Sequence, residues 1–298
     1  MAVAERVVIS GAGCCTALGH DLDSVARSLR EGRDAFRASG ALEGLSVCPA
    51  EDWGQDGARQ QFEGWRHRHY LNRGSRMAVL SGLRALRDAG LEAGLPVRSQ
   101  IIAAVGPMLD VTGEPGLPPQ DTATLGALWL LRWLPNTAAG ALARFARCHG
   151  EALTVNAACA SALQALGEGW RRIRFGLADA VLVAAGDSRL SLGGLLGYHK
   201  ARALSLCAPG TGPRPFDMGR DGFVPGEGGA AFVLESLSSA QARGAHVHAE
   251  ILGYGASVDA ESLTAPEARG TWAELAVRGA LEEAGRMNWF LRWKSSLM

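Results

Sequence analysis

The sequence has almost no lysine, no Cys-x-x-Cys pair, no long hydrophobic run and no excess of either charge. Lysine occurs only at Lys200 and Lys294, so arginine carries nearly all the positive charge. The 30 basic and 30 acidic side chains balance, which argues against a general nucleic-acid or membrane-surface binder. No stretch approaches the roughly 20 apolar residues of a transmembrane helix, and residues 1–9 lack the apolar core of a secretory signal. We therefore expect a cytoplasmic globular protein without nucleic-acid or membrane partners.

Cysteine and histidine are present, but their spacing predicts no metal site. Two His-x-His pairs occur, His67 with His69 and His246 with His248, but neither matches a zinc-site motif of cysteines, histidines and carboxylates. In a reducing compartment most cysteines are small buried hydrophobic residues. The six cysteines of this chain are Cys14, Cys15, Cys48, Cys148, Cys159 and Cys207. The residues around each one must therefore decide which of them is functional.

Hydrophobic periodicity predicts an α/β fold. Residues 6–10 form an apolar run that we interpret as a buried strand ended by Gly11 and Gly13; the third glycine is misplaced for a dinucleotide-binding loop, which favours a tight turn. Residues 37–72 show weak periodicity and suggest a surface excursion. Residues 75–89 predict a helix stopped by Gly90, with one apolar side made of Met77, Leu80, Leu83 and Leu86.

A strand, a helix and a second strand follow one another over residues 153–185. Residues 153–158 and 180–185 are apolar, and residues 160–175 carry apolar side chains three and four apart, at Leu163, Leu166, Trp170 and Ile173. Two wholly apolar strands joined by a helix indicate a parallel sheet that is covered on both faces.

Cys159 stands at the junction of that first strand and its helix, within N-A-A-C-A-S-A (156–162). Small neighbours allow a sharp turn and a close approach to the sulfur. The N-terminus of a helix offers unpaired N–H groups and a partial positive charge, and both favour the nucleophilic thiolate. From these residues alone, a catalytic nucleophile and a buried structural cysteine are both possible.

A series of motifs in a fixed order extends this pattern over residues 6–285. The segment T-V-N-A-A-C-A-S-A-L-Q-A-L-G-E (154–168) resembles the active-site segment of β-ketoacyl-acyl-carrier-protein synthases, the condensing enzymes of fatty-acid and polyketide assembly. Further segments resemble that family in the same order: R-V-V-I-S-G-A-G (6–13), L-P-N-T-A-A-G (134–140), A-R-A-L-S (201–205), R-P-F-D-M-G-R-D-G-F-V-P-G-E-G (214–228), A-E-I-L-G-Y-G-A-S-V-D-A (249–260) and T-A-P (264–266).

The resemblance implies a five-layer α/β/α/β/α thiolase-like fold in which two similar halves each contribute a mixed sheet. It implies that Cys159 accepts an acyl group from a carrier protein, and that a malonyl-carrier protein then loses carbon dioxide and attacks the resulting thioester. The backbone N–H of Cys159 would form half of the oxyanion hole. No cofactor is expected, because the phosphopantetheine arm belongs to the acyl carrier protein. A homodimer, or a heterodimer with a related synthase, is expected as well.

The chain departs from that family in its second half. Members of the family continue into an N-A-H-G-T-like segment, a lysine followed by G-H, and a G-F-G-G-like loop, and these 298 residues contain none of them. We therefore expect residues 1–258 to form an essentially complete N-terminal half with the nucleophile, residues 259–285 to begin a mostly missing C-terminal half, and residues 286–298 to be an atypical tail. The isolated chain is then expected not to complete condensation.

The resemblance also suggests roles for residues away from Cys159. Leu109 and Tyr198 align with positions that line the acyl pocket, although any buried apolar residue would give the same pattern. Arg76 and Arg202 would meet the acidic carrier protein, with a plain solvated face as the alternative. Glu227, in G-E-G-G, is expected to shape a loop near the site.

Two other functions are compatible with the sequence. The chain could be a non-catalytic partner subunit of the chain-length-factor kind, or a degradative thiolase that uses coenzyme A. The retained cysteine at position 159 argues against the first, and the N-A-A-C-A-S segment deep in the chain argues against the second.

Overall fold

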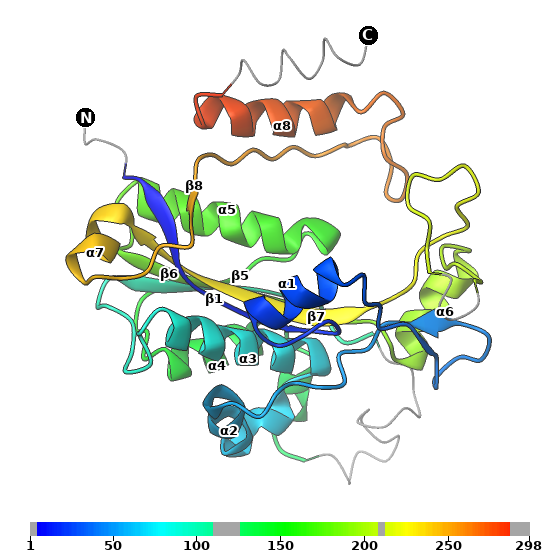
Figure 1. Cartoon of the computed structure of the whole chain (residues 1–298), viewed down its shortest axis with the longest axis horizontal. Coiled ribbons are helices and arrows are strands. Elements are labelled where there is room, and N and C mark those ends of the chain that lie inside the picture. Colours follow the sequence, from blue (N-terminus) through cyan, green and yellow to red (C-terminus); the bar gives the residue numbers. More distant parts are fainter. Residues whose placement is uncertain (1–4, 110–125, 208–211, 287–298) are drawn as a thin grey trace.

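A computed structural model describes residues 5–109, 126–207 and 212–286 (Figure 1). Within these ranges, no helix is long and apolar enough to cross a membrane.

One mixed sheet of six strands forms the centre of the molecule. β5 and β6 both pair parallel with β4, while β7 runs antiparallel to β6 and β1, and β1 antiparallel to β8. The strands, in their order across the sheet, are β5 (Ala152–Thr154), β4 (Ser99–Val105), β6 (Ala180–Ser188), β7 (Glu227–Ser236), β1 (Val7–Thr16) and β8 (Ala249–Ile251). The parallel sheet expected over residues 153–185 is therefore present. However, β5 is shorter than predicted and only partly buried, because it lies at the sheet edge.

Helices cover both faces of this sheet (Figure 1). α3 (Arg73–Asp88) and α4 (Asn136–Phe145) pack on one face, and α5 (Ser161–Arg174) packs on the other. The predicted apolar side of α3 is buried at all four positions, and Gly90 with φ 69° follows its end as expected. Trp170 and Ile173 of α5 are buried against strands β6 and β7. α8 (Thr271–Glu283) lies on the far side of α5 from the sheet (Figure 1).

The remaining elements are short. In the described part of the chain they are α1 (Leu22–Arg30), β2 (Arg37–Ala38), β3 (Ser46–Val47), α2 (Gly57–Glu63), α6 (Leu192–Lys200), α7 (Leu237–Ala242) and the short 3-10 helices η1 (Arg66–Tyr70), η3 (Trp129–Arg132) and η4 (Ala158–Ala160).

The glycines near the start of the chain do not make the predicted turn. β1 continues through them to Thr16, with a bulge after Ile9. A Cβ on Gly11 would lie 2.3 Å from the carbonyl oxygen of Ala85, and one on Gly13 would lie 2.2 Å from that of Ser81. Both glycines therefore allow α3 to approach the strand backbone, and the strand ends later than the sequence suggested.

Residues 37–72 are not merely a surface excursion. β2, β3 and α2 lie in this segment, and Phe62 of α2 is completely buried in the core beside α3. Val47 and Ala50 are buried too. The apolar residues of the segment are spaced too irregularly to give a helical or strand period, although they contribute to the core.

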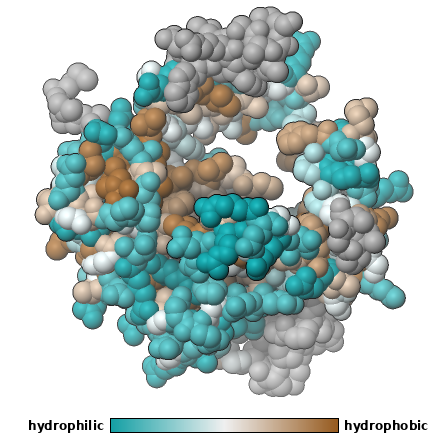
Figure 2. All heavy atoms as spheres, viewed as in Figure 1, coloured by the Kyte–Doolittle hydropathy of each residue, from teal (hydrophilic) through white to brown (hydrophobic). Residues whose placement is uncertain are grey.

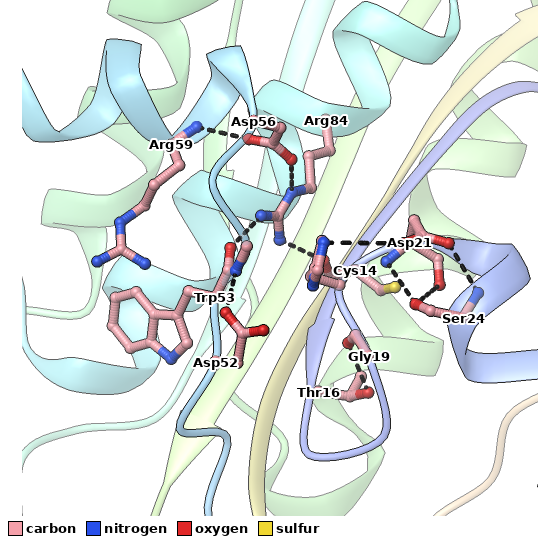
Figure 3. Close-up of polar contacts among 12 residues, drawn as sticks. Cys14, Thr16, Gly19, Asp21, Ser24, Asp52, Trp53, Asp56, Arg59 and Arg84 are labelled. Carbon is pink, nitrogen blue, oxygen red and sulfur yellow. Dashed lines mark hydrogen bonds and ion pairs between the residues drawn. The ribbon is translucent and has the colours of Figure 1, made fainter. Parts of the chain in front are cut away.

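A buried arginine anchors this segment to the sheet (Figure 3). The guanidinium of Arg84 on α3 donates to Asp56 Oδ2 at 2.7 Å, to the carbonyl oxygen of Cys14 at 2.7 Å and to that of Trp53. Asp56 also accepts a hydrogen bond from the backbone N–H of Arg59 at 2.8 Å and so caps α2. One side chain of α3 thereby links α2 to β1.

The domain boundary expected after residue 258 stays a prediction. Residues 287–298, nearly all of the segment we interpreted as an atypical tail, lie outside the described residues.

Candidate active site

Cys159 stands at a tight elbow between β5 and α5. Ala158 has a left-handed φ of 48°, and η4 then leads directly into α5 at Ser161. The hydroxyl of Ser161 accepts a hydrogen bond from the N–H of Ala157 and donates one to the carbonyl oxygen of Ala158, both at 2.7 Å. A left-handed alanine costs about 1–2 kcal/mol, and such strain is concentrated at functional sites. The strand-to-helix junction expected at Cys159 is therefore present.

A cavity of about 630 Å³ opens beside Cys159. Leu109 and Tyr198 line it together with the cysteine, so the structure brings these three predicted residues to one site. The ring of Tyr198 packs edge-on against Phe223, with 5.2 Å between the ring centroids, which fixes its position on α6. The cavity thus joins a nucleophile to an apolar and an aromatic wall.

The strand ends make the floor of the cavity. Val105 is the last residue of β4, Asp187 lies near the end of β6, and Gly228 lies near the start of β7, which runs antiparallel to β6. All three residues line the cavity. The carboxyl ends of parallel strands are the usual place for ligands in α/β sheets. The topology therefore places Cys159 where a substrate is expected.

Cys159 is the most accessible of the six cysteines, all of which lie in the described part of the chain. It is exposed, Cys48 and Cys207 are partly exposed, and Cys14, Cys15 and Cys148 are buried. Burial raises the pKa of Cys14, Cys48 and Cys148, and it raises that of Cys15 to about 11. A raised pKa leaves less thiolate at neutral pH, so burial lowers the reactivity of these cysteines as nucleophiles.

Glu227 lies beside the site but is fully engaged in structural contacts. Its carboxylate is completely buried and accepts hydrogen bonds from Arg73 Nε at 2.6 Å, Ser188 Oγ at 2.7 Å and the backbone N–H of Ala50 at 3.0 Å. These contacts join α3, β6 and the segment after β3. They support the expectation that Glu227 shapes the surroundings of the site.

Arg76 and Arg202 occupy different environments. Arg202 is exposed and lies two residues after the end of α6. Arg76 is half-buried in α3, where its Nε donates to the carbonyl oxygen of Leu71 at 3.1 Å, and burial together with the charge of Arg132 lowers its pKa below the usual value. Arg76 lines a second cavity of about 800 Å³ that also includes Leu109.

Sequence reasoning missed Arg189, which lines the Cys159 cavity. Its Nε contacts Asp187 Oδ2 at 3.0 Å, and its Nη1 donates to the carbonyl oxygen of Pro107 at 2.7 Å. The sequence offered one signal, because Arg189 follows closely after the apolar strand predicted over residues 180–185.

None of the histidines in the described part of the chain lines the Cys159 cavity. His248 lies 2.6 Å from Asp88 Oδ2, and the ring of His67 stacks on Tyr70. Over residues 5–109, 126–207 and 212–286, no group of three or more histidines, cysteines and carboxylates could hold a metal ion.

An opening lies between α8 and the lower part of the molecule in Figure 2, although α8 also packs closely against the backbone at Gly253 and Gly255. Hydrophobic surface lies on its rim in that view. Leu163 on α5 is 69% exposed and Leu275 on α8 is 50% exposed. Leu163 lies on the apolar side predicted for α5, but it is exposed, whereas Trp170 on the same side is buried.

Comparison with known proteins agrees with this arrangement. Residues 4–240 match the family model described as the N-terminal domain of β-ketoacyl synthases. The chain belongs to the β-ketoacyl synthase family. It is 27% identical to 3-oxoacyl-[acyl-carrier-protein] synthase 2 of Vibrio cholerae, in a match that covers 94% of this chain and 70% of that protein.

Solved structures of β-ketoacyl synthases share the fold. A β-ketoacyl synthase from Burkholderia phymatum STM815 superposes with a TM-score of 0.79 at 30% identity, covering 94% of this chain and 71% of that one. The ishigamide ketosynthase/chain length factor gives a TM-score of 0.79 at 28% identity, covering 95% of this chain and 70% of that one. The thiolase-like fold that the resemblance implied is confirmed, and so is membership of a family of condensing acyltransferases. The non-catalytic alternative is not favoured.

Proposed function

We propose that Cys159 is the nucleophile that accepts an acyl group from an acyl carrier protein, in the first half of β-ketoacyl synthesis. One observation carries this proposal: the most accessible cysteine of the chain stands at a strained strand-to-helix elbow and opens into a cavity at the strand ends. The name of the Vibrio relative, which includes the carrier protein, supports the choice of acyl donor.

The chemistry follows from this placement. The Cys159 thiolate attacks the thioester carbonyl and a new carbon–sulfur bond forms. The bond to the phosphopantetheine sulfur breaks, and this sulfur leaves as a thiolate that takes up a proton. The backbone N–H of Cys159 donates to the carbonyl oxygen while negative charge develops on it. Leu109 and Tyr198 contact the acyl chain, because both line the cavity next to the sulfur.

Arg76 and Arg202 are proposed to meet the acidic carrier protein. Arg202 is exposed next to α6, the helix that carries Tyr198. Arg76 has no carboxylate within ion-pair distance among the described residues, so its charge is available to an acidic partner. Cationic side chains near the cavity would steer the carrier toward Cys159 and raise its association rate.

A dimer is also proposed, either with a second copy or with a related synthase. β5 forms the edge of the six-stranded sheet among the described strands, and an edge strand leaves hydrogen-bonding groups free for another chain. The cytoplasmic location expected from composition stays a prediction.

The test is acyl loading from a hexanoyl-carrier protein, read by intact mass. We expect wild-type protein to gain one hexanoyl group, Cys159→Ala to gain none, and the matched control Cys207→Ala, at the partly exposed Cys207, to load like the wild type. Loading of Cys159→Ala at the wild-type rate would refute the assignment.

A further inference from the structure

The Cys159 cavity and the second cavity share one wall. Gly106, Pro107, Leu109 and Asp187 line both of them. Gly106 and Pro107 directly follow β4, and Asp187 stands near the end of β6, so the wall is made by the ends of two neighbouring strands. Movement of this wall would connect a cavity of about 630 Å³ with one of about 800 Å³.

Arg189 fastens this wall from the side of Cys159. Its side chain is only 15% exposed, and its two anchors are the carbonyl oxygen of Pro107 and the carboxylate of Asp187. A Cβ on Gly106 would lie 2.2 Å from Nη2 of Arg189, so the guanidinium lies directly on the backbone at Gly106. The arginine therefore ties the segment after β4 to the end of β6.

A largely buried guanidinium is retained at a cost in solvation, which is offset here by two charge-assisted contacts of fixed geometry. Neither contact involves Cys159 or the elbow. Their effect is local: they hold Gly106 and Pro107 in place and limit how far the Cys159 cavity extends. Beyond the wall, Met108, Leu190 and Leu192 offer apolar surface to a longer chain.

We propose that Arg189 is a positioning residue that holds the wall between the two cavities and thereby limits the length of the acyl chain accepted at Cys159. This inference rests on the proposed function, since it concerns the chain that Cys159 would carry. Short chains fit in front of the wall, whereas longer chains require the second cavity.

The test uses N-ethyl and N-dodecyl iodoacetamide, which alkylate Cys159 without any acyl transfer. The ratio of the dodecyl rate constant to the ethyl rate constant is measured for each protein by peptide mapping and divided by the same ratio for glutathione. We expect Arg189→Ala to raise this ratio on the order of tenfold, which is the discrimination that a single methylene group can produce in a hydrophobic pocket. Arg189→Lys, which keeps the charge and can reach one anchor, should stay close to the wild type.

Arg189→Gln keeps much of the side-chain volume but loses the charge. If Arg189→Ala does not fold, the alkylation ratio of Arg189→Gln tests the proposal in its place. Ratios equal to that of the wild type in Arg189→Ala and Arg189→Gln, or in whichever of these two variants folds, would overturn the proposal. If hexanoyl loading fails but the Arg189 variants raise the alkylation ratio, the acyl-acceptor role of Cys159 is refuted and the proposed role of Arg189 stands. Normal hexanoyl loading with an unchanged alkylation ratio would support the acyl-acceptor role of Cys159 and overturn the proposed role of Arg189.

Discussion

The carboxylate of Glu227 is completely buried, and the guanidinium of Arg73 is its ion-pair partner at 2.6 Å from Nε to Oε2. Arg73 itself is half exposed and also lies over the ring of Trp53, 5.2 Å from its centroid. This pair joins the first turn of α3 to the start of β7, and both residues line the second cavity.

Loss of Arg73 should therefore destabilise the fold. Arg73→Ala leaves a buried carboxylate without its cation, which typically costs about 3 kcal/mol or more. We expect a fall of that size in the free energy of unfolding measured with urea. The matched control is Arg33→Ala, which removes the exposed pair with Glu31 and should cost less than about 1 kcal/mol. Equal effects of the two variants would contradict this account of Glu227.

Stability should fall in alkaline solution because of Cys15. Burial raises the pKa of this thiol from 9.0 to about 11, so the folded state disfavours the thiolate more than the unfolded state does. The resulting stabilisation is complete below pH 9 and is lost as the pH rises from about 9 to about 11, by up to roughly 2 kcal/mol. Thermal unfolding of the wild type and of Cys15→Ala, each at about pH 8 and pH 10.5, measures it. The variant should lose less stability between the two conditions; parallel losses would exclude Cys15 as the cause.

Carrier binding should depend on Arg76 and Arg202. The double charge reversal Arg76→Glu with Arg202→Glu is expected to weaken binding of an acidic carrier protein at least tenfold at low salt, with a loss that shrinks as salt rises. Arg98→Glu is the control, because Arg98 pairs with Asp179 just before β4 starts, at the opposite end of that strand from Cys159. Calorimetric titration at two salt concentrations measures the effect. Unchanged affinity of the double variant at low salt would remove both arginines from the docking surface.

Decarboxylation should be absent from this 298-residue chain. The resemblance assigns that step to two histidines of segments that the sequence does not contain, and no histidine lines the Cys159 cavity among the described residues. Loss of one such donor typically costs on the order of a hundredfold or more in rate. We expect no release of carbon dioxide from malonyl-carrier protein above the rate of the Cys159→Ala variant. Robust release would mean that one of the seven histidines present has taken over the role.

The sequence predicted the parts of the fold whose signal is local. α3 shows a regular apolar face from Met77 to Leu86, and that face is buried as expected. Gly11 and Gly13 were misinterpreted because a glycine at a turn and a glycine under a crossing helix look identical in sequence. The tertiary contact with Ala85 and Ser81 decides between them.

Only part of the candidate site could be predicted from the sequence. Cys159, Leu109 and Tyr198 were found through their motifs, and the structure brings all three to one cavity. Arg189 was missed because its two partners, Asp187 and the carbonyl oxygen of Pro107, are close only after β4 and β6 have paired. A backbone acceptor 82 positions away leaves no trace in the sequence.

The location of the acyl group tests the central claim most directly. Trypsin is expected to release residues 148–171 as one peptide, which contains both Cys148 and Cys159. After loading from hexanoyl-carrier protein, fragmentation of this peptide assigns the added mass to one of the two sulfurs. We expect the hexanoyl group on Cys159, because that sulfur is exposed whereas Cys148 is buried with a raised pKa. A hexanoyl group on Cys148, or on any other cysteine with Cys159 unmodified, would contradict it.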